Sequence, residues 1–169
     1  MAWFSKDLQS LGLDYVDLVL MHHPGVEGGQ FVFGCASVRE CRHETWRALS
    51  ELRARGAIRE VGVSNFGPQQ MRELQALEYA PVAVNQLEYH PFVSRTYHRV
   101  VDFCHQHGIA VTAYCSMGGP ETKDTVLARE HLAHVSSLYG KTPGQILLRW
   151  AIQKNTSVIP GTSNPRHML

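Results

Sequence analysis

Short apolar runs rich in β-branched residues alternate with helix-like segments along the chain, and this alternation constrains the fold more than any other feature. The expected strands cover residues 15–22, 60–64, 82–87, 109–114 and 157–160. The segments between them carry apolar residues at helical spacing, as Trp46, Leu49 and Leu52 do. Such alternation predicts βαβ units and a parallel sheet. The run 15–22 is apolar almost throughout, which is typical of a strand buried on both faces.

Helix boundaries are marked by residues that favour helix ends. We expect helices over residues 42–55, 68–77, 94–107 and 125–139, and one more that begins at Thr142 and Pro143. Gly56 and Gly108 stand just after two of them, where a left-handed residue often ends a helix. Thr as N-cap followed by Pro at the first helical position is a common helix start.

Composition narrows the class of protein. The chain has 169 residues, 44% of them hydrophobic, and 16 basic against 15 acidic residues give a formal charge of +1. This balance without a basic face argues against nucleic acid or an anionic membrane as a partner. No apolar run approaches the ~20 residues of a membrane span, and polar residues interrupt the N-terminus where a signal peptide would be apolar. The four cysteines show no CxxC pair, so reduced thiols and a cytoplasmic location are expected.

Five ordered motifs resemble those of the aldo-keto reductases. The stretch LGLDYVDLVLMHHP is similar to the family's strand-four signature, which ends in His-Trp-Pro; here a second histidine replaces the tryptophan. GVSNF and VNQLEYHP match the strand-five and strand-six motifs. AYCSMG resembles the strand-seven motif, and VIPGTSNPRH resembles the strand-eight segment that wraps the adenosine phosphate. The match covers nearly the whole chain.

The resemblance implies a (β/α)8 TIM barrel and reduction of a small aldehyde or ketone with NADP or NAD. It implies that His22 is catalytic and hydrogen-bonds the substrate carbonyl. Ser64, Asn65 and Gln86 would hold the nicotinamide carboxamide, which needs both donor and acceptor partners. Tyr114 would stack on the nicotinamide ring. The remaining residues of the implied cofactor site are Cys115, Met117, Gly161, Thr162, Arg166 and His167. In such a barrel the site lies where the strands end.

Simpler interpretations remain for several of these residues. His22 at a strand end is compatible with a histidine satisfied by the backbone, and Asn65 with a cap of the next helix. Of the two adjacent histidines, His23 is expected on the opposite side of the strand from His22. The cysteines and other histidines match no zinc spacing, so no metal is expected. The cluster of residues 31–33 is either a substrate-facing loop or plain packing.

Departures from the family limit what the resemblance implies. A complete barrel takes about 250 residues, so we expect a single domain over residues 1–169 that is truncated at the N-terminus and at the C-terminal end. The family's catalytic Asp, Tyr and Lys would lie on the missing N-terminal strands. The alternative function is therefore a non-catalytic remnant or isoform that binds nucleotide or a partner chain.

Two further expectations follow from the same departures. Gly161 stands where many members carry a lysine for the 2′-phosphate, so no strong preference for NADP over NAD is expected. Exposed sheet edges would favour self-association.

Overall fold

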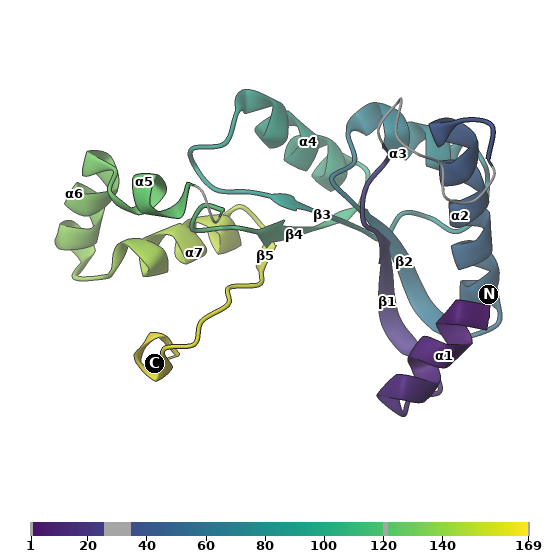
Figure 1. The fold of residues 1–169 in the computed structure, drawn as a ribbon. Coiled ribbons are helices and arrows are strands. Elements are labelled where there is room, and N and C mark those ends of the chain that lie inside the picture. Colours follow the sequence, from purple (N-terminus) through teal and green to yellow (C-terminus); the bar gives the residue numbers. More distant parts are fainter. Residues whose placement is uncertain (1, 26–34, 120–121, 169) are drawn as a thin grey trace. The chain divides into compact units, whose positions relative to one another are not determined.

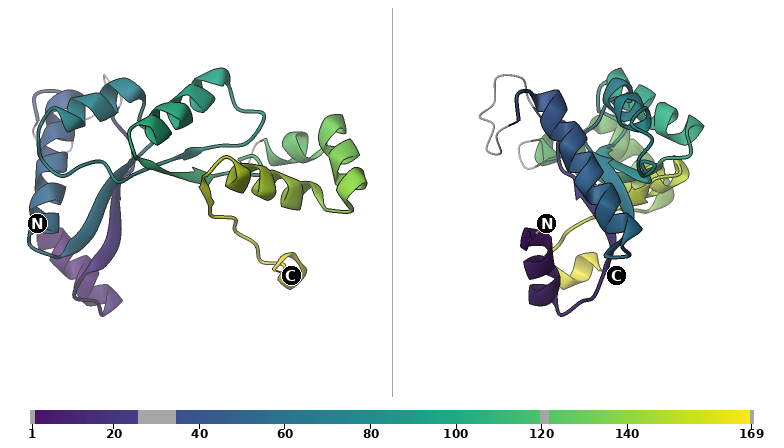
Figure 2. Two further views of the ribbon diagram at one scale, coloured as in Figure 1. Left: turned by 180° about the vertical axis from the view of Figure 1, so that it is seen from behind. Right: turned by 90° about the vertical axis from the view of Figure 1, so that its right-hand side faces the viewer.

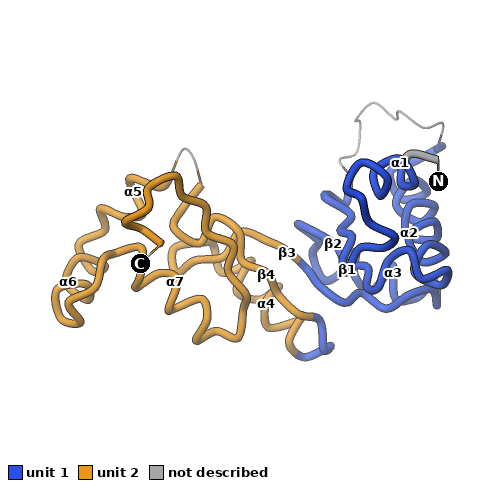
Figure 3. The backbone as a smooth tube through the Cα atoms, turned by 90° about the horizontal axis from the view of Figure 1, so that it is seen from below, with its two compact units in different colours: residues 1–85, 106–109 blue, residues 86–105, 110–169 orange. Residues whose placement is uncertain are grey.

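The computed structural model describes residues 2–25, 35–119 and 122–168 (Figure 1). Within them the chain forms two compact units, residues 1–85 with 106–109 and residues 86–105 with 110–169 (Figure 3). The residues 31–33, for which a substrate-facing or a packing role was left open, lie outside the described part.

The first unit is built from two parallel strands and the helices that precede and follow them. Its elements are α1 (Ala2–Leu11), β1 (Val16–Met21), α2 (Val38–Ala54), β2 (Ile58–Ser64) and α3 (Pro68–Gln75). β1 and β2 pair in parallel from Val16 opposite Ile58 to Met21 opposite Val63. Helix α2 packs along β2 with Trp46, Leu49 and Leu52 buried (Figure 2). The helical stripe predicted from the sequence is therefore confirmed.

Helix ends in this unit follow the predicted signals. The Ser37 side chain accepts a hydrogen bond from the Glu40 N–H at the start of α2, four residues earlier than expected. Gly56 follows the end of α2 with a φ of 78°, in the left-handed region. Helix α3 starts at Pro68 after Gly67, whose N–H donates to the Gln70 side chain.

The second unit contains most of the remaining strands and helices. Its elements are β3 (Val84–Glu88, whose first two residues belong to the first unit), α4 (Arg95–Gln106), β4 (Ala110–Tyr114), α5 (Lys123–Leu127), α6 (Glu130–Tyr139), α7 (Pro143–Gln153), β5 (Ser157–Val158) and the 3₁₀ turn η1 (Pro165–His167). β4 and β5 pair in parallel, and α7 packs against α6 and β5. The predicted single helix 125–139 is two helices, because the helical hydrogen bonds of α5 end at Ala128 and those of α6 begin after Arg129.

The strands are hydrogen-bonded in sequence order, β1-β2-β3-β4-β5, in one parallel sheet. The predicted α/β class is confirmed, and consecutive parallel strands joined by helices are the pattern of a part of a (β/α)8 barrel. β2 is buried along most of its length, with Val61 and Val63 fully covered. β1, at the edge of the sheet order, is not buried on both faces as predicted: Leu18 is 40% exposed and only Met21 is buried. Apolar composition alone did not distinguish an edge strand from an inner one.

Two cysteines are joined in the first unit. Cys35, just before α2, forms a disulfide with Cys41 in its first turns. The prediction of reduced thiols is wrong for this pair, because the helix start brings two cysteines six residues apart together without a CxxC spacing. Cys104, which is buried, and Cys115, which is half-buried, are not in a disulfide.

Candidate functional site

His22 and His23 follow β1 directly and lie side by side. β1 ends at Met21, and both histidines are exposed. Their rings stack with centroids 4.4 Å apart and an angle of 24° between the planes. The expectation that they point to opposite sides of a strand is wrong, since the alternation of a strand no longer applies after Met21. Both imidazoles are therefore present at the end of β1.

Asn65 connects the end of β2 to the end of β1. Its Nδ2 donates to the His22 carbonyl oxygen at 3.1 Å and to the Ser64 Oγ at 3.0 Å, and lies 3.3 Å from the His23 Nδ1. Asn65 has a φ of 63°, and asparagine tolerates this left-handed region better than most residues. The alternative that Asn65 merely caps the next helix is wrong, because the N-cap of α3 is Gly67. The structure thus brings together His22, Ser64 and Asn65 at the ends of β1 and β2.

A buried amide that the sequence interpretation missed supports this turn. Asn85 in β3 is fully buried. Its Nδ2 donates to the Phe66 carbonyl at 2.9 Å, and its Oδ1 accepts from the Phe66 N–H at 3.5 Å. Asn85 therefore fixes the backbone that leaves Ser64 and Asn65. The available signal was the period of two in β3, which places Asn85 on the buried side with Leu87.

The other predicted nicotinamide residues lie in the second unit. Gln86 is the third of five residues in β3, not at a strand end as predicted, because β3 continues to Glu88. Tyr114 is the last residue of β4, as predicted, and is half-buried. Burial and, second, the Glu88 carboxylate raise the pKa of the Tyr114 hydroxyl, which keeps it protonated at neutral pH. Since residues 86 and 88 alternate with the buried residues of β3, Gln86 and Glu88 share one face of that strand.

Glu88 was also missed, although it influences several neighbours. Its Oε1 lies 3.2 Å from the His90 Nε2, while the His90 Nδ1 accepts the Phe92 N–H at 3.2 Å. His90 therefore carries its proton on Nε2 and donates it to Glu88. Burial lowers the pKa of His90, with Glu88 acting in the opposite direction. Burial first and Glu88 second raise the pKa of the Cys115 thiol, so Cys115 is a neutral thiol rather than a thiolate.

The turn after β4 contains two more predicted cofactor residues. Cys115 has a φ of 47°, in the left-handed region, and its carbonyl accepts the Gly118 N–H at 2.8 Å. Met117 packs against a hydrophobic cluster of Val126, Leu132 and Leu147. Its role toward a cofactor stays a prediction.

The C-terminal segment that follows β5 is exposed throughout residues 159–168. The Thr162 Oγ1 lies 3.3 Å from the His167 Nδ1, and the Asn164 Oδ1 accepts the Arg166 N–H at 3.0 Å. A side chain at Gly161 would meet no atom within 4 Å. The structure therefore gathers Thr162, Arg166 and His167 around one short turn, η1, and leaves space at Gly161.

Neither a metal centre nor a membrane helix is found where the structure describes the chain. Across residues 2–25, 35–119 and 122–168, no group of three or more His, Cys, Asp or Glu side chains is arranged to hold a metal ion. Among the helices described, none is both long and apolar enough to cross a membrane.

His22 and the hydrogen-bonded pair of Ser64 and Asn65 lie where two neighbouring parallel strands end, which is the place of the site in a (β/α)8 barrel. The chain belongs to the aldo/keto reductase family, whose model matches residues 1–169. It is 36% identical to the probable NAD(P)H-dependent D-xylose reductase of Aspergillus flavus, over 96% of this chain and 57% of that protein. It is also 36% identical to the 9,11-endoperoxide prostaglandin H2 reductase of Trypanosoma cruzi, over 97% of this chain and 52% of that protein.

Solved structures agree with this assignment. An aldo-keto reductase enzyme from a Medee basin deep-sea metagenome library superposes with a TM-score of 0.82 at 30% identity, covering 98% of this chain and 55% of that one. An aldo/keto reductase from Brucella melitensis superposes with a TM-score of 0.77, also at 30% identity, covering 99% of this chain and 57% of that one. The chain spans about half the length of the curated relatives it matches.

Proposed function

We propose that this family member is an NAD(P)H-dependent oxidoreductase that reduces aldehydes or ketones to alcohols. The observation that carries the proposal is the hydrogen bond from Asn65 to the carbonyl of His22. It joins the predicted carboxamide-binding motif at the end of β2 to the predicted catalytic histidine at the end of β1. Relatives that are named as NAD(P)H-dependent or NADPH-dependent reductases support the cofactor class.

Several of the predicted site residues have side chains that suit a nicotinamide cofactor. A carboxamide group donates through its nitrogen and accepts through its oxygen, and Ser64, Asn65 and Gln86 supply side chains of both kinds. Tyr114 is neutral and half-buried, so its ring is suited to contact a flat apolar surface. The exposed turn around Arg166 offers a guanidinium for a phosphate.

His22 and Asn65 have defined parts in the proposed reaction. When bound, the reduced nicotinamide would supply a hydride to the substrate carbonyl carbon as the C=O π electrons move to the oxygen, and that oxygen would then take up a proton from solvent water. His22, exposed at the end of β1, donates a hydrogen bond to the carbonyl oxygen and stabilises the negative charge that develops there. Asn65 holds the backbone of His22 in place through the carbonyl oxygen.

Loss of absorbance at 340 nm, measured with a reactive aldehyde such as nitrobenzaldehyde, tests this function on the protein as its native gene produces it. We expect His22→Ala to lower kcat by about 100-fold, the cost of one oxyanion donor. The matched control is His23→Ala, which removes the neighbouring imidazole and should be milder. Equal losses in both variants would contradict the role given to His22. Tight NADPH binding with no turnover in the native protein would support the nucleotide-binding alternative instead.

A cytosolic location is part of the same proposal. The half-buried free thiol of Cys115 is compatible with it, whereas the Cys35–Cys41 disulfide argues for a less reducing compartment. Cell fractionation with an antibody to the chain tests the location, and recovery outside the cytosolic fraction would overturn it.

A further inference from the structure

Arg42 in α2 contacts the chain just after the two histidines. Its Nη1 donates to the Pro24 carbonyl oxygen at 2.6 Å. The rest of the guanidinium binds Glu73 of α3, with Nε 3.0 Å from Oε1 and Nη2 3.0 Å from Oε2. Such a two-pronged pair fixes the plane of the guanidinium as well as its position. The third donor is therefore aimed at Pro24 by the geometry of the other two.

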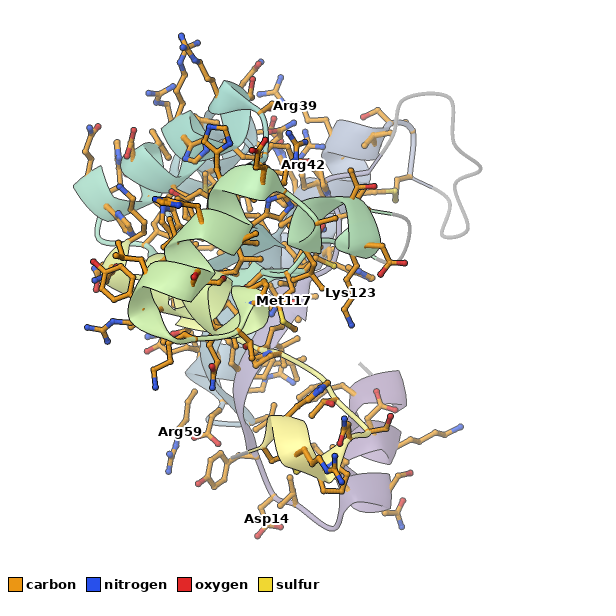
Figure 4. All side chains as sticks on the ribbon, turned by 90° about the vertical axis from the view of Figure 1, so that its left-hand side faces the viewer. Asp14, Arg39, Arg42, Arg59, Met117 and Lys123 are labelled. Carbon is orange, nitrogen blue, oxygen red and sulfur yellow. A yellow bond between two sulfur atoms is a disulfide. The ribbon has the colours of Figure 1, made fainter. Side chains whose placement is uncertain are left out.

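This pair is well shielded from solvent. The side chains of Arg42 and Glu73 are 10% and 13% exposed, whereas most surface ion pairs are mobile and contribute little. His43 also contacts Glu73, at 2.8 Å, and Arg39 does so at 3.7 Å with a side chain that is 70% exposed. Figure 4 shows Arg39 and Arg42 together on α2. Glu73 thus contacts Arg42, His43 and Arg39, and of these three residues Arg42 also donates to the Pro24 carbonyl.

Two hydrogen bonds hold the segment of residues 22–25. Asn65 binds the carbonyl of His22, and Arg42 binds that of Pro24. Gly25 follows with a φ of 86°, and a side chain there would collide with Val38 of α2. His23 lies between the two anchored carbonyls, and His22 is the residue whose own carbonyl is the first of them. The two hydrogen bonds therefore restrict how far the backbone that carries both imidazoles can move.

We propose that Arg42 is a positioning residue for His22. Held by Glu73, it anchors the Pro24 carbonyl and so fixes the direction in which the chain presents the His22 imidazole after β1. The catalytic consequence rests on the proposed carbonyl reductase function, whereas the anchoring of residues 22–25 does not. Arg42 itself touches neither substrate nor cofactor in this assignment.

The test measures backbone mobility and activity separately in the chain of residues 1–169. Nuclear relaxation of the ¹⁵N-labelled chain gives order parameters for the amides of His22, His23 and Gly25. In Arg42→Met we expect them to fall from about 0.85 to about 0.6. Arg42→Lys keeps the positive charge but loses the two-pronged contact with Glu73. Its order parameters should lie between those of the wild-type chain and those of Arg42→Met. Arg39→Met is the matched control, with the same change on the same helix and the same carboxylate, and should leave the order parameters unchanged.

Activity of the native protein supplies the second measurement. Arg42→Met should lower kcat about tenfold through misplacement of the imidazole, with the KM for NADPH unchanged. Should Arg42→Met not fold, Glu73→Gln, which retains the side-chain volume, is expected to loosen the same amides. Rigid amides in a folded Arg42→Met chain would overturn the inference. Absence of turnover in the wild-type protein would refute the proposed function, and the order parameters would still decide the anchoring.

Discussion

The turn after β2 and the segment after β5 both resemble family motifs but differ in structural support. Ser64 is buried, and the turn that follows it is tied by Asn65 to β1 and by Asn85 to β3. Residues 159–168 are exposed, and the recorded side-chain hydrogen bonds there join residues of the same segment. A motif therefore identifies the residue types at a site without showing whether they are preorganised.

The largest expected effect comes from placing the same side chain in both regions. A Cβ at Gly62 in β2 would lie 2.6 Å from the Val84 carbonyl oxygen and 2.7 Å from Leu20. Gly62→Ala should therefore lower the free energy of unfolding by about 3 kcal/mol. The control, Gly161→Ala, meets open space and should change it by less than about 0.5 kcal/mol. Urea unfolding measures both, and similar losses would contradict the difference between the regions.

A second prediction tests how much the hydrogen bonds of buried His90 in the second unit contribute to the free energy of unfolding. His90→Phe keeps the ring but removes the bonds to Glu88 and to the Phe92 N–H, so unfolding at pH 7.5 should become easier by about 2 kcal/mol. The pKa of His90 is lowered on folding from 6.5. The stability that neutral His90 supports is therefore present above pH 6.5 and is lost as the pH falls.

The wild-type chain should accordingly lose stability below pH 6.5 that the variant does not lose. Urea unfolding at pH 7.5 and at pH 5 measures the free energy of unfolding of the wild-type chain and of His90→Phe. The difference between these two free energies should be smaller at pH 5 than at pH 7.5. A difference that grows in acid would mean that folded His90 is protonated and paired with Glu88 as an ion.

A third prediction concerns the exposed segment itself. Because Gly161 carries no charge for a 2′-phosphate, NADP should bind no more than about tenfold, or 1.4 kcal/mol, more tightly than NAD. Calorimetric titration of the native protein with both cofactors measures the margin. A hundredfold preference for NADP over NAD that disappears in Arg166→Ala would show that Arg166 in this exposed turn binds the 2′-phosphate tightly. The conclusion that the segment after β5 has less structural support than the turn after β2 would then be wrong.

The smallest effect on stability is expected at β1, which resembles the C-terminal segment in its exposure. Leu18 is 40% exposed and stands opposite Glu60 in β2. Leu18→Lys should alter the free energy of unfolding by less than about 0.5 kcal/mol, yet reduce the self-association that we propose for exposed sheet edges. Size-exclusion chromatography with light scattering tests this, and a monomeric wild-type chain would contradict it.

Local patterns in the sequence were sufficient for much of the fold. The strand order followed from the alternation, and Gly56, Gly108 and the Thr142–Pro143 pair marked helix ends where the structure has them. Features that depend on long-range contacts were missed. The Arg42–Glu73 pair joins residues 31 apart, and no local spacing announces it.

Strand ends were a further source of error. β1 ends at Met21, just before His22, so the strand alternation used to predict the orientation of His23 does not apply. β3 continues two residues past Gln86, so Gln86 does not lie at the strand end where it was predicted. The motifs pointed to candidate residues, but the hydrogen bonds between neighbouring strands decide where each strand ends.

The left-handed backbone at Asn65 and Cys115 restricts how these positions can evolve. Both residues leave a strand with a positive φ, a conformation that costs most side chains roughly 1–2 kcal/mol. At position 65 the residues best suited to that backbone are glycine, asparagine and aspartate, and of these only asparagine keeps the amide that donates to His22. At position 115 the backbone alone favours glycine or asparagine over cysteine, so any advantage of the thiol must come from its predicted part in the cofactor site. The two strand ends are therefore restricted in different ways.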